Sequence, residues 1–455
     1  MKTFVFEHLL SGNTIYSPGT VTVDDSGMVS HVGSEAIQGE EEMLKGIAIP
    51  GMPNLHSHAF QRAMLGHTES GRPSVKDSFW TWRELMYSLV QKLEPNDIQA
   101  IAEFLYMEML EAGYTSVGEF HYVHHKPGGE KYSPVSTLGE RILQAGHSAG
   151  IGMTLLPVLY MHGGFNQAPR DNQLRFVHRN LEDYLNLFQA LKKITDSISN
   201  TVLGVAPHSV RAVDFQTLTS LLSSIDSDIP IHIHIAEQLL EVQDSLKMLG
   251  ARPVQWLLDN FEVNERWCLV HATHLTDQEK SDLAATQAVV GLCPSTEANL
   301  GDGIFDSEFY LEKGGRIGIG SDSHVCVSVP DELRILEYGQ RLTKHRRNIL
   351  CDEETASVGQ NLYVKTCRGG AQALKQPVGV IEKGKRADIV MLDHRHSKIC
   401  SVPVSKILDA WIFGHAAGAL RRVMVAGKWI VEDGEHLSRA RIEARYRSVV
   451  AKLFH

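Results

Sequence analysis

Histidine and carboxylate residues occur at spacings that could bind a metal ion. His56 and His58 form an HxH pair after an apolar run, and residues i and i+2 of a strand point to the same side. An HxH pair alone is weak evidence, but His234 (in HxxE) and Asp322 (in GSDS) also follow apolar runs. Three imidazoles and one carboxylate suit Zn²⁺ or another first-row divalent ion. We therefore predict one divalent metal ion per subunit on these four residues, with Zn²⁺ as the first choice and Fe²⁺ as the alternative.

These residues follow apolar runs that alternate with segments of helical periodicity. The eight runs span residues 46–58, 115–122, 152–160, 201–209, 229–237, 266–274, 288–296 and 316–323. Continuous apolar runs of this kind are typical of parallel strands, and eight repeats in about 320 residues fit a (β/α)₈ barrel. An open doubly wound sheet is the alternative. Six runs end in polar clusters, which a barrel would bring to one mouth, so we predict an α/β fold with a TIM barrel.

Both ends of the chain are predicted to be β-rich. Residues 20–33 alternate around a DDSG turn, which indicates a hairpin, and the strands expected after residue 386 are punctuated by glycine. Residues 438–453 have helical apolar spacing. We expect residues 1–49 plus 373–455 to form a small discontinuous β-sandwich domain with a C-terminal helix, and residues 50–372 to form the catalytic barrel.

Composition excludes several classes of partner. The formal net charge is −10 without a Lys/Arg-rich run, which argues against nucleic acid and anionic membranes. No apolar stretch approaches ~18 residues, and MKTFVFEHLL lacks the features of a signal peptide. Six scattered cysteines without a CxxC pair favour a reducing compartment. We expect a cytoplasmic protein that assembles as a homodimer.

Several motifs together resemble a known family. PGMPNLHSH, HIHIAE, LVHATH, GSDS and GKRADIVMLD are similar to motifs of the amidohydrolase superfamily, and within it to the deaminase branch, whose members bind one metal ion. NLHSHAFQRAM, DSFWTWRELMY and EFHYVHH resemble members that act on N-formimino-L-glutamate in histidine degradation. The resemblance covers essentially the whole chain. It implies hydrolytic deimination of this linear amidine to N-formyl-L-glutamate and ammonia.

The charge of a bound metal ion suggests roles for three residues. Such an ion lowers the pKa of bound water from ~15.7 towards ~7. We expect Asp322 to accept the proton of this water and Glu237 to protonate the departing nitrogen. His271 is expected to stabilise the tetrahedral intermediate through a hydrogen bond. The alternative for Glu237 is a structural salt bridge at a helix N-terminus.

A dicarboxylate substrate requires cationic and hydrogen-bonding groups in the pocket. Arg211, just beyond the fourth run, is a candidate for bidentate binding of a carboxylate, and Arg83, in the loop segment after the first run, is a second. The family resemblance suggests that Gln61, Tyr122 and His208 also contact the substrate. A packing or surface role is the alternative for each of them.

Two further groups of residues are assigned structural roles. Packing is preferred over a lid or dimer contact for the aromatic cluster Phe79, Trp80, Trp82 and Tyr87. His124 and His125 have no partner at metal-ligand spacing, and we expect them in a solvated loop.

Two other functions are considered. A deaminase of a ring amidine (guanine-, S-adenosylhomocysteine- or triazine-like) would use the same metal ligands and the same glutamate. Arg211 and the FWTWRELMY segment favour the acyclic dicarboxylate over such a flat, uncharged base. A catalytically inactive barrel acting as a scaffold would be expected to lack a ligand or the glutamate, and this chain has them all.

Overall fold

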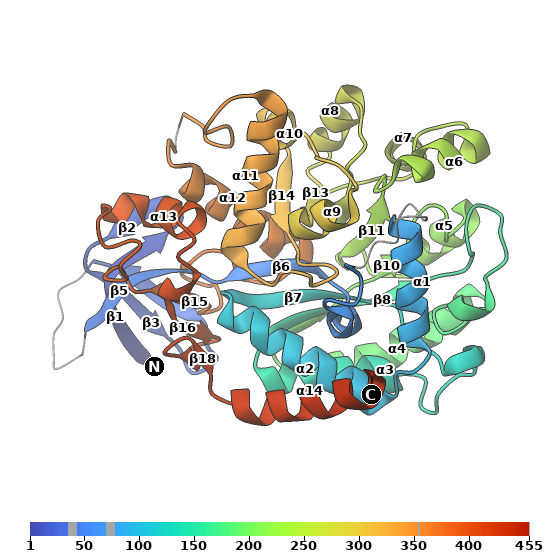
Figure 1. Ribbon diagram of the computed structural model, residues 1–455, viewed down its shortest axis with the longest axis horizontal. Coiled ribbons are helices and arrows are strands. Elements are labelled where there is room, and N and C mark those ends of the chain that lie inside the picture. The colour runs from blue at the N-terminus through green and yellow to red at the C-terminus, as the bar shows by residue number, and fades with distance from the viewer. Residues whose placement is uncertain (35–42, 70–77, 354, 455) are drawn as a thin grey trace.

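The computed structural model describes residues 1–34, 43–69, 78–353 and 355–454 (Figure 1). Parallel strands occupy all eight predicted positions in the middle of the chain. They are β6 (Met52–Ser57), β7 (Tyr114–His121), β8 (Gly152–Leu159), β9 (Thr201–Leu203) with β10 (Ala206–Pro207), β11 (Ile231–Ile235), β12 (Trp267–His271), β13 (Val289–Leu292) and β14 (Arg316–Ile319). Hydrogen bonds group β6 to β10 into one sheet and β11 to β14 into another.

Two short bridges join these sheets into a closed ring. At one seam Val205 pairs with Ile231 in parallel register. At the other seam Ser57 pairs with Asp322, and the amide of Asp322 donates to the carbonyl of His56 at 3.1 Å. The first and last strands are therefore linked through their backbones, which confirms the barrel and excludes the open sheet.

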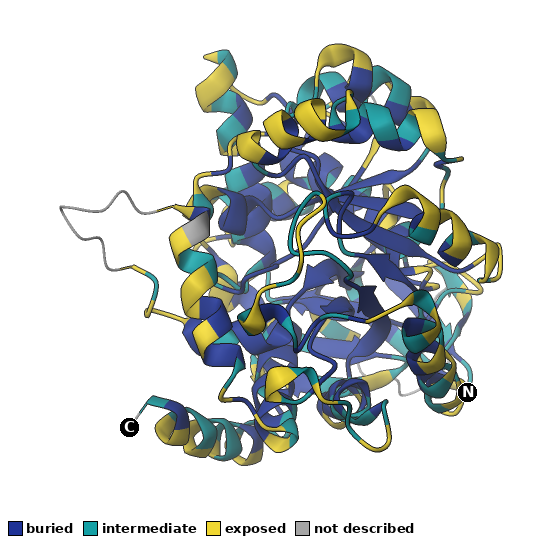
Figure 2. Cartoon of the chain, turned by 90° about the vertical axis from the view of Figure 1, so that its right-hand side faces the viewer, coloured by how far each residue is buried: buried dark blue, intermediate teal, exposed yellow. Residues whose placement is uncertain are grey.

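Helices cover the outside of the barrel, so that their inner faces and the strands are buried (Figure 2). Asn180, Asp214 and Thr276 cap α4, α5 and α8, because each side chain accepts an amide hydrogen bond from the first turn of its helix. The helices are α2 (Pro95–Glu111), α3 (Thr137–Ala149), α4 (Leu181–Thr195), α5 (Phe215–Ser223), α6 (Leu239–Leu249), α7 (Pro253–Asn260), α8 (Asp277–Ala285), α9 (Pro294–Leu300), α10 (Ser307–Glu312), α11 (Val329–Lys344) and α12 (Val358–Leu374). None of the described helices has the length and apolar character needed to cross a bilayer.

The two ends of the chain build one β domain beside the barrel. Its nine strands form a single hydrogen-bonded sheet, in which β5 pairs with β1 from the N-terminal part and with β15 from the C-terminal part. The predicted hairpin is the antiparallel pair β3–β4. The strands are β1 (Lys2–Ser11), β2 (Thr14–Tyr16), β3 (Gly19–Val23), β4 (Val29–Gly33), β5 (Met43–Pro50), β15 (Ile389–Leu392), β16 (Leu420–Val425), β17 (Lys428–Glu432) and β18 (Glu435–His436). The discontinuous arrangement is as expected, and the domain boundaries at residues 50 and 372 stay a prediction.

The C-terminal helix fastens this domain to the barrel. Helix α14 (Arg439–Phe454) runs alongside α2 (Figure 1), where the rings of Tyr446 and Phe104 stack with centroids 3.9 Å apart. Lys452 forms an ion pair with Asp97 at 2.8 Å.

A buried ion pair lies where the β domain meets the base of the barrel. The guanidinium of Arg386 donates to both carboxylate oxygens of Asp388 at 2.9 and 2.7 Å, and a third bond at 2.8 Å reaches Gln376. The carbonyl of Asp388 accepts the amide of Gly51, and the guanidinium packs on Gly152, where a side chain would collide with it. Because both charges are buried, removal of either side chain would leave the other as an unpaired buried charge, which is strongly destabilising.

We predict that Asp388→Ala lowers the free energy of unfolding by ~3–5 kcal/mol, since it leaves a buried guanidinium without its counter-ion. The double variant Arg386→Met/Asp388→Ala should lose clearly less. Urea unfolding of the four proteins of this cycle measures both effects. As a control, Arg447→Ala removes a surface pair with Glu443, and its effect on the free energy of unfolding should be far smaller. If Asp388→Ala costs no more than this control, the pair does not stabilise the junction.

Candidate active site

Three imidazoles and one carboxylate meet at the mouth of the barrel. Nε2 of His56 lies 3.1 Å from Nε2 of His58 and 3.0 Å from Nε2 of His234. Oδ1 of Asp322 lies 3.3 Å from Nε2 of His58 and 3.5 Å from Nε2 of His56. All four side chains are buried, and they come from the ends of β6, β11 and β14. The structure thus brings the four predicted metal ligands together.

The arrangement of these atoms fits a tetrahedral divalent ion. Ligand atoms at 2.0–2.1 Å from Zn²⁺ would lie about 3.3–3.4 Å from one another, close to the spacing found here. Nδ1 of His58 lies 2.9 Å from the carbonyl of Phe120, so this nitrogen carries the proton and Nε2 keeps its lone pair for a metal ion. Burial lowers the pKa of His56 to about 3 and lowers that of His58, so both rings are neutral, as metal ligation requires.

Glu237 and His271 lie beside this cluster. Nε2 of His271 is 3.8 Å from Oε1 of Glu237 and 3.8 Å from Oδ2 of Asp322, while its Nδ1 lies 3.2 Å from Glu297. Burial alone would lower the pKa of His271, but the three surrounding carboxylates raise it to about 10, so the ring is cationic at neutral pH. Burial and the charge of Asp322 raise the pKa of Glu237 to about 7, against the opposing effect of His271. Glu237 can therefore both accept and release a proton near neutral pH.

Several residues at these strand ends adopt left-handed backbone conformations. The φ angle is 52° at Ala236, 68° at His271, 49° at Ala272, 45° at Asp322 and 62° at His324. Such conformations cost free energy for residues other than glycine, and they persist where the surrounding structure enforces them, often at functional sites. Here they aim His271 and Asp322 at the cluster.

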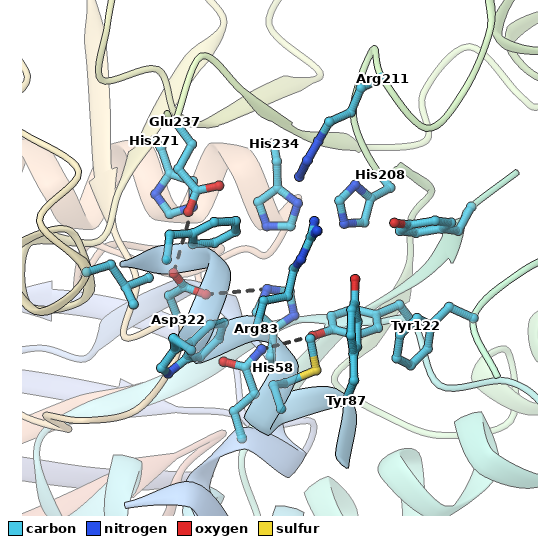
Figure 3. A pocket seen from close by; sticks show the side chains of 17 residues that line it. His58, Arg83, Tyr87, Tyr122, His208, Arg211, His234, Glu237, His271 and Asp322 are labelled. Atoms are coloured by element: carbon cyan, nitrogen blue, oxygen red, sulfur yellow. Dashed lines mark hydrogen bonds and ion pairs between the residues drawn. The ribbon is translucent and has the colours of Figure 1, made fainter. Parts of the chain in front are cut away.

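The cluster forms one side of a pocket (Figure 3). The residues predicted to bind substrate all line it, namely Gln61, Tyr122, His208, Arg211 and Arg83. The amide of Gln61 donates to the hydroxyl of Tyr122 at 2.9 Å. Arg83 and Arg211 reach into the pocket from opposite sides (Figure 3), and burial together with the charge of Arg211 lowers the pKa of Arg83. Two cationic groups thus lie close together on the pocket wall.

The sequence interpretation is wrong for the segment that carries Arg83. This segment is not a loop but helix α1 (Phe79–Val90), and it forms one wall of the pocket. Phe79, Trp82 and Tyr87 line the pocket with Arg83, so packing alone does not describe their position. The side chain of Trp80 lies outside the described part of the structure. A periodicity argument could not place this helix, because its position is set by contacts with residues 170–175.

Glu119 and His324 support the ligands from behind and were not predicted to do so. The carboxylate of Glu119 accepts the hydroxyl of Ser57 at 2.5 Å and the amide of Ala59 at 2.8 Å, on either side of His58. Nε2 of His324 lies 3.2 Å from both the Ser57 hydroxyl and the His58 amide. The position of Glu119 in EFHY, at the end of an apolar run, was the available signal.

His124 and His125 are buried and not solvated, contrary to expectation. The loop that follows β8 covers them, and the carbonyl of Arg175 accepts both of their amides at 2.9 and 3.0 Å. Their rings pack around His178, with centroids 4.8 and 5.4 Å away. Burial lowers the pKa of both histidines, so both rings are neutral, and Nε2 of His124 lies 3.0 Å from the carbonyl of Val158.

Barrel, discontinuous β domain and metal-ligand cluster together define an amidohydrolase. Residues 47–430 match the model of the Amidohydrolase family, and the chain belongs to this family of hydrolases. It is 48% identical to formimidoylglutamate deiminase of Pseudomonas aeruginosa, over 95% of each chain. The crystal structure of an amidohydrolase from Brucella melitensis is 39% identical over the full length of both chains, with a TM-score of 0.95. An adenosine deaminase from Xanthomonas campestris with bound zinc shares the fold at 20% identity, over 99% of this chain and 98% of that one, with a TM-score of 0.80.

We predict that zinc stabilises the protein through this cluster. Ligand at about 1,000 times its Kd stabilises a folded protein by ~4 kcal/mol, so chelation should lower the midpoint of thermal unfolding and added zinc should restore it. In His56→Asn the midpoint should not respond to zinc. Calorimetry with metal analysis of the same samples measures this. An undiminished response in His56→Asn would place the metal elsewhere.

Proposed function

We propose that this chain hydrolyses N-formimino-L-glutamate to N-formyl-L-glutamate and ammonia. The observation that carries the proposal is the pair of partly buried guanidinium groups, Arg83 and Arg211, in the same pocket as the His–Asp cluster. A substrate with two carboxylates and an amidine has a charge to match each part of this pocket. The similarity to the Pseudomonas deiminase over nearly the whole chain supports the same substrate.

The residues of the cluster would share the chemistry in the following way. A metal ion held by the three imidazoles and Asp322 would supply a Lewis acid and an activated water molecule as nucleophile. Asp322, whose pKa the neighbouring histidines hold well below its usual range although burial opposes them, is an ionised proton acceptor beside this position. His271 donates a hydrogen bond from Nε2 to the negative charge that develops on the attacking oxygen.

Glu237 completes the reaction by moving a proton to the leaving group. Water adds to the C=N carbon, and the C–N bond then breaks as the nitrogen takes up protons and leaves as ammonia. A carboxyl group with a pKa of about 7 is protonated often enough to deliver such a proton from Oε1 and ionised often enough to take one up. The formamidine is cationic near neutral pH, so the carboxylates of Glu237 and Asp322 also attract it to this end of the pocket.

The identity of the metal ion, the pathway, the location and the assembly are part of the same proposal. We propose Zn²⁺ as the resident ion, supported by the zinc-containing structure from Xanthomonas campestris and by the ligand set. A role in histidine degradation follows from the proposed substrate. The cytoplasm and a homodimeric assembly are the location and state in which we expect the enzyme to act.

Deamination of a ring amidine is the second candidate, favoured by the fold shared with an adenosine deaminase. The two assignments differ in their demands on the pocket, because a neutral, flat base offers no charge to Arg83 and Arg211. The test is ammonia release by the zinc-loaded protein from N-formimino-L-glutamate, adenosine and guanine. We expect turnover of formiminoglutamate alone. Turnover of a purine without turnover of formiminoglutamate would reject the proposed substrate.

Glu237→Gln should reduce kcat by ~10²–10⁴-fold while the metal content is unchanged, because the amide keeps the shape of the side chain but cannot move a proton. Steady-state kinetics and metal analysis of the same preparation measure the two quantities. A kcat within about tenfold of the wild-type value would remove Glu237 from proton transfer.

A further inference from the structure

Two tyrosine hydroxyls in the pocket wall share a buried glutamine. Tyr87 comes from α1 and Tyr160 follows β8, and both line the pocket. Nε2 of Gln173 lies 2.9 Å from the hydroxyl of Tyr160 and 3.2 Å from that of Tyr87. Gln173 itself is 1% exposed, so its amide is available to no other partner in solvent.

The orientation of this amide is fixed by the backbone. Oε1 of Gln173 accepts the amide of Arg170 at 2.9 Å, so the NH₂ group must face the two tyrosines. Each phenol oxygen therefore accepts a hydrogen bond from Gln173, and its own proton is left to be donated. An acceptor that enters the pocket can therefore take a hydrogen bond from each hydroxyl.

The surroundings of the hydroxyls select a negatively charged acceptor. Arg83 lies one helical turn before Tyr87, with its guanidinium carbon 5.6 Å from the centre of the Tyr87 ring. Figure 3 shows the hydroxyl of Tyr87 pointing towards the region where Arg83 and Arg211 meet. The carboxylates in the described lining of the pocket are Glu237 and Asp322, both in the catalytic cluster. The tyrosine side of the pocket therefore offers donors and positive charge.

We propose that Tyr87 and Tyr160 bind a carboxylate of the substrate and that Gln173 is the positioning residue that presents both hydroxyls as donors. The inference rests on the proposed function and adds three residues to the recognition of its dicarboxylate substrate. Burial raises the pKa of Tyr160, which keeps this phenol protonated and able to donate. Since Gln173 also connects Tyr87 of α1 to Tyr160 after β8, it links the helix that carries Arg83 to the rest of the carboxylate site.

Gln173→Glu and Gln173→Leu test this proposal. In Gln173→Glu one oxygen still accepts the Arg170 amide, but the other would accept protons from the tyrosines and so compete with the substrate. Both variants should raise KM for N-formimino-L-glutamate by ~10–100-fold, Glu more than Leu, with kcat within ~threefold of wild type. The Kd of the dicarboxylate N-formyl-L-glutamate, measured by calorimetry on the metal-loaded protein, should rise by a similar factor and gives a measure independent of turnover.

Gln91→Leu is the matched control for the alternative that Gln173 only holds α1 in place. Its amide donates to the carbonyl of Asn172 at 3.0 Å, so it joins the end of α1 to the same loop without lining the pocket. KM and Kd should change little in this variant. In a Tyr87→Phe/Tyr160→Phe background, Gln173→Leu should have no further effect on KM, because the groups that it orients are absent.

The outcomes separate this inference from the proposed function. If Gln91→Leu raises KM as much as Gln173→Leu, or if Gln173→Leu keeps its full effect in the double phenylalanine background, the positioning role is wrong. If the wild type does not turn over formiminoglutamate but binds N-formyl-L-glutamate in a Gln173-dependent manner, the carboxylate site is retained and the proposed reaction is rejected.

Discussion

The seam that closes the barrel between β6 and β14 is the constraint on which the active site depends. Here Ser57 pairs with Asp322, the amide of Asp322 donates to His56, and the amide of His58 donates to the carbonyl of Asp322 at 3.2 Å. These backbone hydrogen bonds hold three of the four predicted ligands, His56, His58 and Asp322, next to one another. In an open sheet β6 and β14 would not meet, and Asp322 could not reach the imidazoles. The metal-ligand cluster can therefore form only when the barrel is closed.

This closure also concentrates titratable groups in a small buried volume, where their charges must offset one another. The structure keeps imidazoles such as His56 neutral through burial, keeps Asp322 ionised through the adjacent histidines, and keeps His271 cationic through three carboxylates. Glu237 lies between these extremes, because desolvation and the charge of Asp322 oppose the cation of His271. Glu237, the residue assigned to proton transfer, is thus the one whose pKa lies near neutral pH.

The catalytic side of the site could be predicted from the sequence because each residue lies where a strand ends, so local apolar periodicity locates it. The wall formed by α1 could not be predicted in this way. Its position depends on Gln173, which bonds Tyr87, and on Arg175, which donates to the carbonyls of Val90 and Leu93. These contacts join segments that are more than 80 residues apart and leave no periodic signature. The burial of His124 escaped prediction for the same reason, since the same loop covers it.

The division of charge within the pocket gives the substrate one favourable orientation. Burial and the charge of Arg211 both lower the pKa of Arg83, so the two guanidinium groups contribute positive charge to the same part of the pocket. A carboxylate bound there would be attracted by both guanidinium groups, so binding of the acid end is favoured at this end of the pocket. A reversed substrate would place its cationic amidine against the guanidinium groups and its carboxylates against Glu237 and Asp322, which is unfavourable at both ends. Recognition of the acid end therefore also directs the reacting C=N carbon towards the catalytic cluster.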